Sequence, residues 1–202
     1  MKYWWVNQNQ TFTQEVGGGY LWSPKRRADG ARNYFYDTMT YVEPGDLVFS
    51  FKDTLIQAIG IIQGNGYESP KPEEFGTTGE NWSAIGWRVD VAYTVLPASD
   101  RIRPKDMMGQ LAPLLPDKYS PLRHNGDGIQ SVYLTEVPAP MADVLLSAIG
   151  QLALGIREAS LHLDPEVQRQ KAEEAITRAI DRSPIEETTR KALVAARVGQ
   201  GR

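Results

Sequence analysis

The sequence predicts an α+β protein, in which a small β-barrel decorated with short helices is followed by C-terminal helices. Residues 85–95 alternate apolar and polar side chains over the length of a half-buried strand. Several shorter apolar runs before residue 150 are separated by turn-forming residues, and after residue 155 apolar side chains recur at helical spacing. Short strands with a few helices between them are typical of small barrels.

The individual elements follow from periodicity and turn residues. Gly45-Asp46 precedes a strand with Leu47, Phe49 and Phe51 on one face. Asn125-Gly126-Asp127-Gly128 is a turn signal before another strand. We expect strands over 3–6, 47–51, 55–62, 85–95 and 129–137, and short helices over 33–40, 104–115 and 141–149.

The C-terminal part is expected to be helical. Asp164-Pro165 is typical of a helix start, and an alanine-rich stripe follows at helical spacing. Ser183 and Glu186 form a capping box that opens another helix. We therefore expect two domains, residues 1–155 and 156–202, the second a helical linker.

Composition excludes several classes of function. The 202 residues contain no cysteine, which excludes disulfides, thiolate metal sites and a cysteine nucleophile. The only histidines, His124 and His162, have no motif partners, so we expect neither a catalytic residue nor a metal site. No apolar run reaches the roughly 18 residues of a membrane span. We expect a cytoplasmic protein with no membrane partner.

The first forty residues carry the strongest functional signal. Aromatic side chains, a glycine triplet and a cation cluster follow one another. Flat rings stack on bases and cations neutralise phosphates, so the pattern favours nucleic acid. A core strand followed by a solvated loop explains the same residues equally well. The net charge of −3 permits nucleic-acid binding without favouring it. The expected phosphate contacts are Lys25, Arg26, Arg27 and Arg32.

Four blocks, YWWVNQNQT, GGYLWSPK, ARNYFYD and PGDLVFSFKDTLIQAIG, resemble the EVE domain of the PUA superfamily over residues 1–150. The version they resemble most is fused to HNH nucleases in bacterial modification-dependent (type IV) restriction endonucleases. Residues 193–202 resemble the segment that leads into the HNH domain. The resemblance implies a PUA-like barrel and a nuclease domain in cis that is absent from this chain. A divalent metal is expected only in that nuclease domain, and no cofactor in this chain.

The resemblance further implies that the domain flips a modified cytosine, 5-methylcytosine or 5-hydroxymethylcytosine, out of double- or single-stranded DNA into an aromatic pocket. We expect Pro24, Trp82 and Tyr133 to form this pocket, with Trp22 and Ser23 at its rim. Core packing is the alternative for each aromatic residue, and it is the expectation for Trp4, Trp5 and Trp87. Base-edge readout is assigned to Asp53 and to the amide of Asn7 or Gln8, although a turn is the simpler role for Asp53.

Magnitudes limit the specificity of such a pocket. One buried methyl group adds only about 0.8 kcal/mol, and an apolar pocket rejects an added hydroxyl poorly. We expect both modified bases to be accepted and unmodified cytosine to bind more weakly. The alternatives are a modified-RNA or other RNA-binding PUA-like module, or a protein-interaction domain. The C-terminal helices either shield the nuclease until DNA is bound or act as a spacer.

Overall fold

The computed structural model describes residues 1–129 and 131–182. The chain divides into two compact units, Met1–Asp164 and Pro165–Arg202. The first unit extends past the expected boundary at residue 155, because a helix ending at Ser160 contributes Ala153 and Ile156 to its core. Among the helices of the described residues, none is long and apolar enough to cross a membrane.

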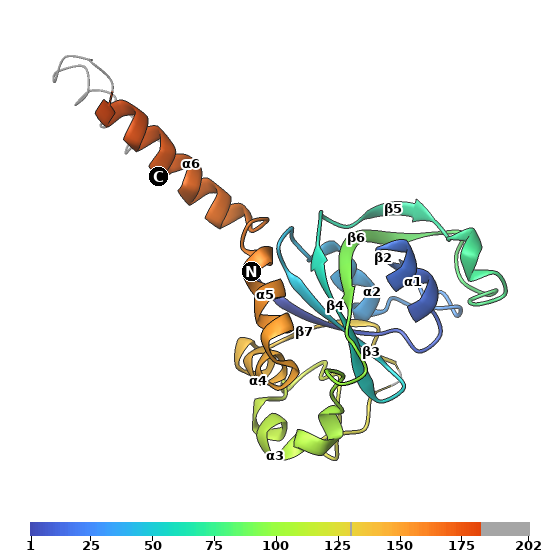
Figure 1. Cartoon of the computed structure of the whole chain (residues 1–202). Helices are drawn as coiled ribbons and strands as arrows, with labels where there is room; N and C mark the ends of the chain where they lie inside the picture. The colour runs from blue at the N-terminus through green and yellow to red at the C-terminus, as the bar shows by residue number, and fades with distance from the viewer. Residues whose placement is uncertain (130, 183–202) are drawn as a thin grey trace. The chain divides into compact units, whose positions relative to one another are not determined.

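The first unit is a mixed α+β structure built around a sheet that curls into a half-barrel (Figure 1). The strand order is β2-β6-β4-β3-β1-β7, and β5 also pairs with β6. Only β1 and β3 run parallel; the other pairs are antiparallel. The strands are β1 (Tyr3–Asn7), β2 (Tyr20–Pro24), β3 (Leu47–Lys52), β4 (Leu55–Ile62), β5 (Tyr67–Pro70), β6 (Ile85–Val95) and β7 (Leu134–Val137).

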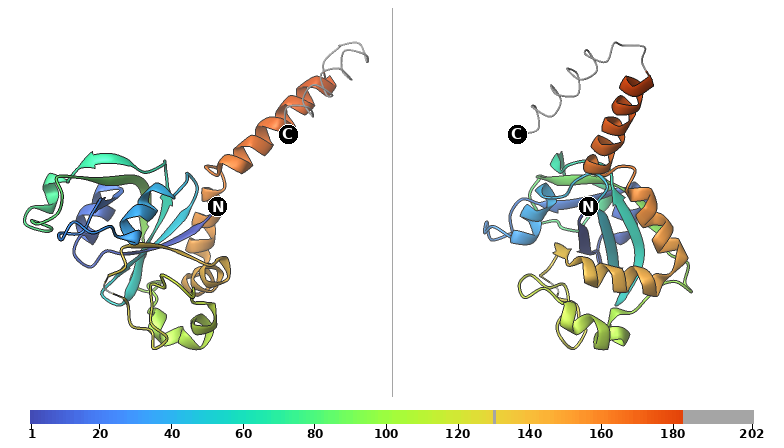
Figure 2. Two further views of the ribbon diagram at one scale, coloured as in Figure 1. Left: turned by 180° about the vertical axis from the view of Figure 1, so that it is seen from behind. Right: turned by 90° about the vertical axis from the view of Figure 1, so that its left-hand side faces the viewer.

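Helices and single turns connect these strands. The α-helices are α1 (Phe12–Gly18), α2 (Tyr34–Asp37), α3 (Met108–Leu111), α4 (Ala139–Ile149) and α5 (Gln151–Ser160). The 3-10 turns are η1 (Thr38–Thr40), η2 (Glu73–Phe75), η3 (Pro104–Met107) and η4 (Ala112–Leu114). Helices α4 and α5 pack on one face of the sheet, and η1 contributes Met39 to the cluster on the other face. In both views of Figure 2, α4 and α5 lie beside the strands of the sheet.

The two faces of the sheet bury separate apolar clusters. Trp5 and Phe49 face α4 and α5, in one cluster with Leu145 and Ile156. Trp4 and its neighbours on the opposite face fill the concave side of the sheet. Because alternate residues of β1 point to opposite faces, both indoles of the Trp4-Trp5 pair are buried. The expectation that these two tryptophans pack in the core is confirmed.

Most predicted elements are present, with one strand shortened. β6 has the predicted bounds, and Leu47, Phe49 and Phe51 share one face of β3 as expected. The strand predicted over 129–137 is reduced to β7, because the side-chain amide of Asn7 takes the carbonyls of Ile129 and Val132 out of any ladder.

Helix α1 and strand β5 were missed by the sequence analysis. Gly17 and Gly18 form the end of α1, and Gly19 is its C-cap at a φ of 71°. The glycine triplet is therefore a helix terminus, a position that favours residues without a Cβ atom. β5 continues the course of β4 along β6 after the break at Gly64-Asn65-Gly66.

The described part of the second unit is a single helix, α6 (Pro165–Arg182), which starts at the predicted proline. The predicted capping box at Ser183 and Glu186, and the segment 193–202, lie outside the described residues.

Candidate functional site

Strand β2 is the element around which the candidate site is built. Its residues alternate between two environments: Tyr20 and Trp22 pack with Phe75, whereas Leu21 belongs to the concave cluster. Ser23 shares the face of Leu21 because it lies two residues further along the strand. At Pro24 the strand ends, and the predicted cation cluster follows at once. Trp22 and Ser23 therefore lie on opposite faces of β2, and Pro24 with the cations lies at its end.

Trp22 and Trp82 form the aromatic clamp of this site. Their rings lie nearly parallel, with centroids 6.1 Å apart and an interplanar angle of 26°. Phe75 meets both rings edge-on at centroid distances of 5.8 Å and 6.1 Å. Trp22 is buried and its indole Nε1 donates to the Ser69 carbonyl, whereas Trp82 is partly exposed on the segment between β5 and β6.

Two glycines leave room for the clamp. A Cβ atom at Gly86 would lie 2.4 Å from the Trp22 ring, and one at Gly79 would lie 2.1 Å from the Trp82 ring. Gly79 also adopts a φ of 66°, a left-handed conformation that L side chains rarely adopt. Each indole therefore packs directly on a glycine backbone, so the positions of both rings depend on the absence of a side chain beneath them.

The hydroxyl of Ser23 is buried without a protein partner. Ser23 is 1% exposed, and its Oγ is the one buried side-chain oxygen or nitrogen in the described residues that forms no hydrogen bond. Leaving a buried hydroxyl unpaired costs roughly 1–3 kcal/mol. Such a group in a folded protein points to a partner that is not part of the protein chain.

Trp87 pairs with Ser23 across the β2–β6 ladder, so both side chains lie on one face. Trp87, which was expected to pack in the core, packs against the concave cluster but remains partly exposed. The ammonium of Lys25 lies 4.4 Å from the centroid of its ring. The face of β2 that carries the unpaired Ser23 hydroxyl therefore also has an aromatic ring, that of Trp87, with the Lys25 ammonium above it.

Glu15 joins β2 to the segment that precedes β7. Its Oε1 accepts hydrogen bonds from the Trp22 amide at 2.8 Å and from the Tyr133 hydroxyl at 2.5 Å. Its Oε2 accepts from Thr11 and Gln8, each at 2.7 Å. Burial raises the pKa of Glu15 from 4.5 to about 7, against the lowering effect of these hydrogen bonds. Burial, then the charge of Glu15, raises the pKa of Tyr133 as well.

The structure brings most of the predicted pocket residues together around β2, but on both of its faces. Trp22 and Trp82 lie on one face and Ser23 on the other. The Tyr133 hydroxyl accepts from the Trp22 amide at 3.1 Å, and Pro24 lies opposite Gly86.

Asn7 and Asp53, two of the residues assigned to base-edge readout, have different surroundings. Asn7 donates from its amide to Ile129 and Val132 and accepts from the indole of Trp5. Its side chain thus holds the segment that carries Tyr133. Asp53 is exposed on the β3–β4 turn at a φ of 48°, where its amide donates to Asn9.

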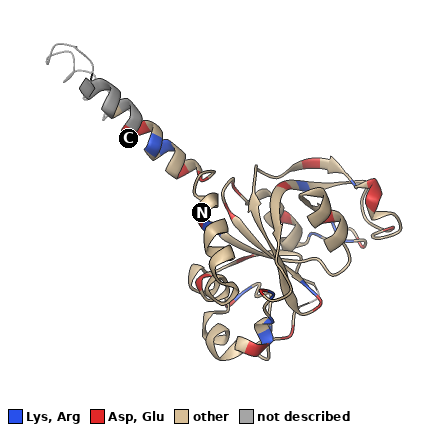
Figure 3. Ribbon diagram, in the orientation of Figure 1, with Lys and Arg blue, Asp and Glu red and all other residues tan. Residues whose placement is uncertain are grey.

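The predicted phosphate-binding cations all have protein partners. Lys25 pairs with Glu68, Arg27 with Asp29 at 3.1 Å and Arg32 with Asp37 at 2.9 Å. A guanidinium nitrogen of Arg26 donates to the Gly30 carbonyl. Exposed ion pairs of this kind contribute about 0–1 kcal/mol each, so a phosphate can displace them at little cost. Figure 3 shows cations and carboxylates interspersed along the ribbon.

Sequence reasoning missed Glu15 as a site residue. The available signal was the spacing of Thr11 and Glu15, which lie on one side of a helix four residues apart. That signal is weak, because the burial of Glu15 arises from β2 and the segment before β7, which are distant from it in sequence.

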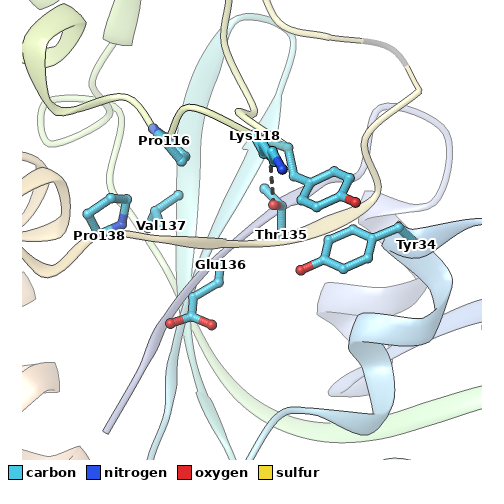
Figure 4. A pocket seen from close by; sticks show the side chains of 8 residues that line it. Tyr34, Pro116, Lys118, Thr135, Glu136, Val137 and Pro138 are labelled. Atoms are coloured by element: carbon cyan, nitrogen blue, oxygen red, sulfur yellow. Dashed lines mark hydrogen bonds between the residues drawn. The ribbon is translucent and has the colours of Figure 1, made fainter.

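A second surface feature is a pocket that includes Tyr34 of α2. Tyr34 and Tyr119 stack with centroids 3.7 Å apart and line a pocket of about 260 Å³ together with Lys118, Glu136 and two prolines (Figure 4). Nothing in the structure shows what would occupy it. Among the described residues, no group of carboxylate and imidazole side chains could hold a metal ion.

No protein-family model matches the sequence, and no curated protein is significantly similar to it. Solved structures with a related chain path include a protein from Pseudomonas putida, 16% identical at a TM-score of 0.49, with 73% of this chain and 99% of that chain covered. A protein from Pseudomonas syringae is 15% identical at a TM-score of 0.47, with 73% and 99% covered. A protein from Leishmania major is 14% identical at a TM-score of 0.43, with 74% and 94% covered. At these identities and TM-scores the likenesses carry no argument about function.

Proposed function

We propose that this chain is a nucleic-acid-binding module that takes a modified cytosine, extruded from DNA, into the site around β2. The observation that carries the proposal is the clamp of Trp22 and Trp82, two nearly parallel indole rings of which Trp22 is buried and Trp82 is partly exposed. Stacking one base on aromatic rings returns roughly 1–3 kcal/mol, which is comparable with the few kcal/mol that extrusion costs.

The clamp is closed in this structure, because Trp82 packs against the buried ring of Trp22. A base lying between the two rings needs about 3.4 Å on each side, so Trp82 has to move away from Trp22 before a base can enter. Trp82 lies on the segment that links β5 to β6, outside the strand ladders. Movement of that segment changes the spacing without breaking the sheet.

Polar and charged groups near β2 suit the other parts of a nucleotide. On the face of β2 opposite the clamp, the unpaired Ser23 hydroxyl offers a donor and an acceptor to a polar ligand, but not to a base held between Trp22 and Trp82. The cations that begin at Lys25 directly follow β2. Phosphates of the DNA strand that carries the extruded base can therefore reach them. Within this proposal Asp53 and Asn7 are weak candidates for base readout, because Asp53 is exposed and the Asn7 amide is already paired.

Recruitment of an HNH nuclease in cis rests on residues 193–202 alone and remains part of the proposal. A module that reads modified RNA is the second candidate, because exposed aromatic clamps also bind single-stranded RNA. The described residues contain no feature that selects deoxyribose over ribose. The titration below therefore compares DNA with RNA.

The test is an equilibrium titration of the chain against matched DNA duplexes, single DNA strands and RNA strands carrying cytosine, 5-methylcytosine or 5-hydroxymethylcytosine. We expect the modified DNA to bind several-fold more tightly than the unmodified DNA. Trp82→Ala should weaken binding of modified DNA at least tenfold, because one stacking face is lost.

Tyr41→Ala is the matched control, because it removes an aromatic residue that is 48% exposed away from the clamp. It should bind like the wild type. Equal affinity for all bases, or an unchanged affinity in Trp82→Ala, would contradict a base-reading clamp. Tighter binding of the RNA strands would favour the second candidate.

A further inference from the structure

Glu15 is a fully buried carboxyl group that the proposed recognition of the base does not use directly. One oxygen receives the Trp22 amide and the Tyr133 hydroxyl, and the other receives Thr11 and Gln8. These donors come from β2, from the segment before β7 and from the turn between β1 and α1. A single side chain thus connects β2 to the β1–β7 part of the sheet, with which β2 forms no ladder.

The connection lies at a free edge of the sheet. β2 is the terminal strand of the order, paired only with β6, so the amides on its outer side have no neighbouring strand. The Trp22 amide points to this side and finds Glu15 and Tyr133 instead. Glu15 therefore accepts the hydrogen bond that a neighbouring strand would otherwise accept from the Trp22 amide. Trp22 is also the residue whose indole forms the buried half of the clamp.

Both ends of the connection are anchored. The Gln8 amide oxygen accepts from Ser50 of β3, and the Gln8 backbone amide donates to Phe51. On the other side, the backbone amide of Asn7 donates to the Tyr133 carbonyl at 2.9 Å. Glu15 is thus held from the central strands, and movement of its carboxyl group would be transmitted to Trp22 and Tyr133 together.

We propose that Glu15 is a positioning residue of the base site: it fixes the Trp22 backbone and the Tyr133 ring relative to each other and so sets the orientation of the buried half of the clamp. The effect on binding rests on the proposed function, whereas the effect on Trp22 and Tyr133 does not. The titratable groups that face Glu15 are the phenols of Tyr20, Tyr93 and Tyr133.

The binding arm of the test is a double-mutant cycle. Glu15→Gln, Tyr133→Phe and the double variant are titrated with a DNA strand that carries one 5-methylcytosine. If Glu15 acts through Tyr133, each single change should weaken binding at least fivefold. The double variant should then bind within twofold of the weaker single variant, because the two residues form one unit.

The structural arm uses the free protein. Glu15→Ala should accelerate amide hydrogen exchange of Trp22 at least tenfold relative to that of Phe49, a buried residue of a central strand. Glu15→Gln retains an acceptor and should give a smaller acceleration. If Glu15→Ala does not fold, the Glu15→Gln measurement and the cycle still decide the proposal.

Multiplicative effects in the cycle, or unchanged Trp22 exchange in both Glu15 variants, would overturn the positioning role. If the wild-type chain binds none of the strands, the proposed function fails. The exchange arm alone then supports or overturns the positioning of Trp22 by Glu15.

Discussion

At the scale of single residues, the site contains two buried polar groups that differ in their hydrogen bonding. Glu15 receives four hydrogen bonds, yet its burial still dominates and raises its pKa. Ser23 receives none. Both groups reduce the stability of the free protein at neutral pH, since one is a carboxyl group whose charged form is disfavoured by burial and the other is an unpaired hydroxyl. Such costs concentrate at functional sites.

The pKa of Glu15 predicts a dependence of stability on pH. The folded state keeps the proton up to about pH 7, whereas the unfolded state releases it near 4.5. Stability should therefore fall as pH rises through that window, by about 3 kcal/mol in total, and stay level above it. Glu15→Gln should remove this slope in urea unfolding curves measured between pH 4.5 and 8.

The exposed residue Glu158 provides the control, since Glu158→Gln should retain the wild-type slope. A wild-type stability that rises between pH 4.5 and 7 relative to that of Glu15→Gln would contradict the assigned burial of a neutral Glu15.

The unpaired hydroxyl of Ser23 predicts the effect of its removal on folding. Ser23→Ala removes a hydroxyl that has no partner, so the free energy of unfolding should stay the same or rise by about 1 kcal/mol. Affinity for modified DNA should stay within twofold, because Ser23 lies on the face of β2 opposite the clamp. Ser50→Ala is the matched control, because Ser50 is equally buried but donates to Gln8, and its loss should destabilise the fold. Equal destabilisation by the two changes would show that Ser23 has a partner within the folded chain.

At the scale of elements, the pairing of β2 with β6 sets the position of the Trp22 ring. Gly86 of β6 lies opposite Pro24 at the end of β2, and the Trp22 ring packs on it. Gly86→Ala would put a Cβ atom 2.3 Å from the Ser23 carbonyl oxygen and 2.4 Å from the Trp22 ring. We expect a loss of about 1–3 kcal/mol of stability and a changed tryptophan fluorescence spectrum. Gly109→Ala has open space around it and should leave both unchanged or raise stability by up to about 1 kcal/mol. Similar stabilities of the two variants would contradict the packing of Trp22 on Gly86.

Periodicity determined which elements could be predicted from the sequence. β6 alternates over eleven residues, and its bounds were predicted correctly. Helix α1 was missed because its two glycines and its polar residues give no apolar stripe, and the residue that it buries is Glu15. β7 was predicted too long because the pairing of residues 129–133 depends on the Asn7 side chain, more than a hundred residues away.

The candidate site was predictable in composition but not in arrangement. The run Trp22-Ser23-Pro24 is visible in the sequence, and strand alternation already places neighbouring residues on opposite faces. The stacking of Trp82 on Trp22 and the bond of Tyr133 to Glu15 depend on the curl of the sheet. Local sequence does not encode such contacts, because they join residues roughly 60 and 118 positions apart.

At the scale of the whole molecule, the first unit is expected to work on its own. Its core includes Ile156, and Asp164 pairs with the N-terminal amine at 3.0 Å. A fragment of residues 1–164 should unfold cooperatively and bind the test strands like the full chain. A fragment ending at residue 155 loses Ile156 and the second half of α5, so its thermal midpoint should be lower by several degrees. Equal midpoints would contradict the assignment of α5 to the first unit.

The central claim is that a base leaves its strand and enters the clamp of Trp22 and Trp82. The most direct measurement places 2-aminopurine next to a single 5-methylcytosine in a DNA duplex, where its fluorescence rises when the neighbouring base unstacks. The account predicts a rise with the wild-type chain, with Tyr41→Ala and with the fragment 1–164, and none with Trp82→Ala at saturating protein. Saturable binding of the duplex by the wild-type chain without any rise would contradict base extrusion into the clamp.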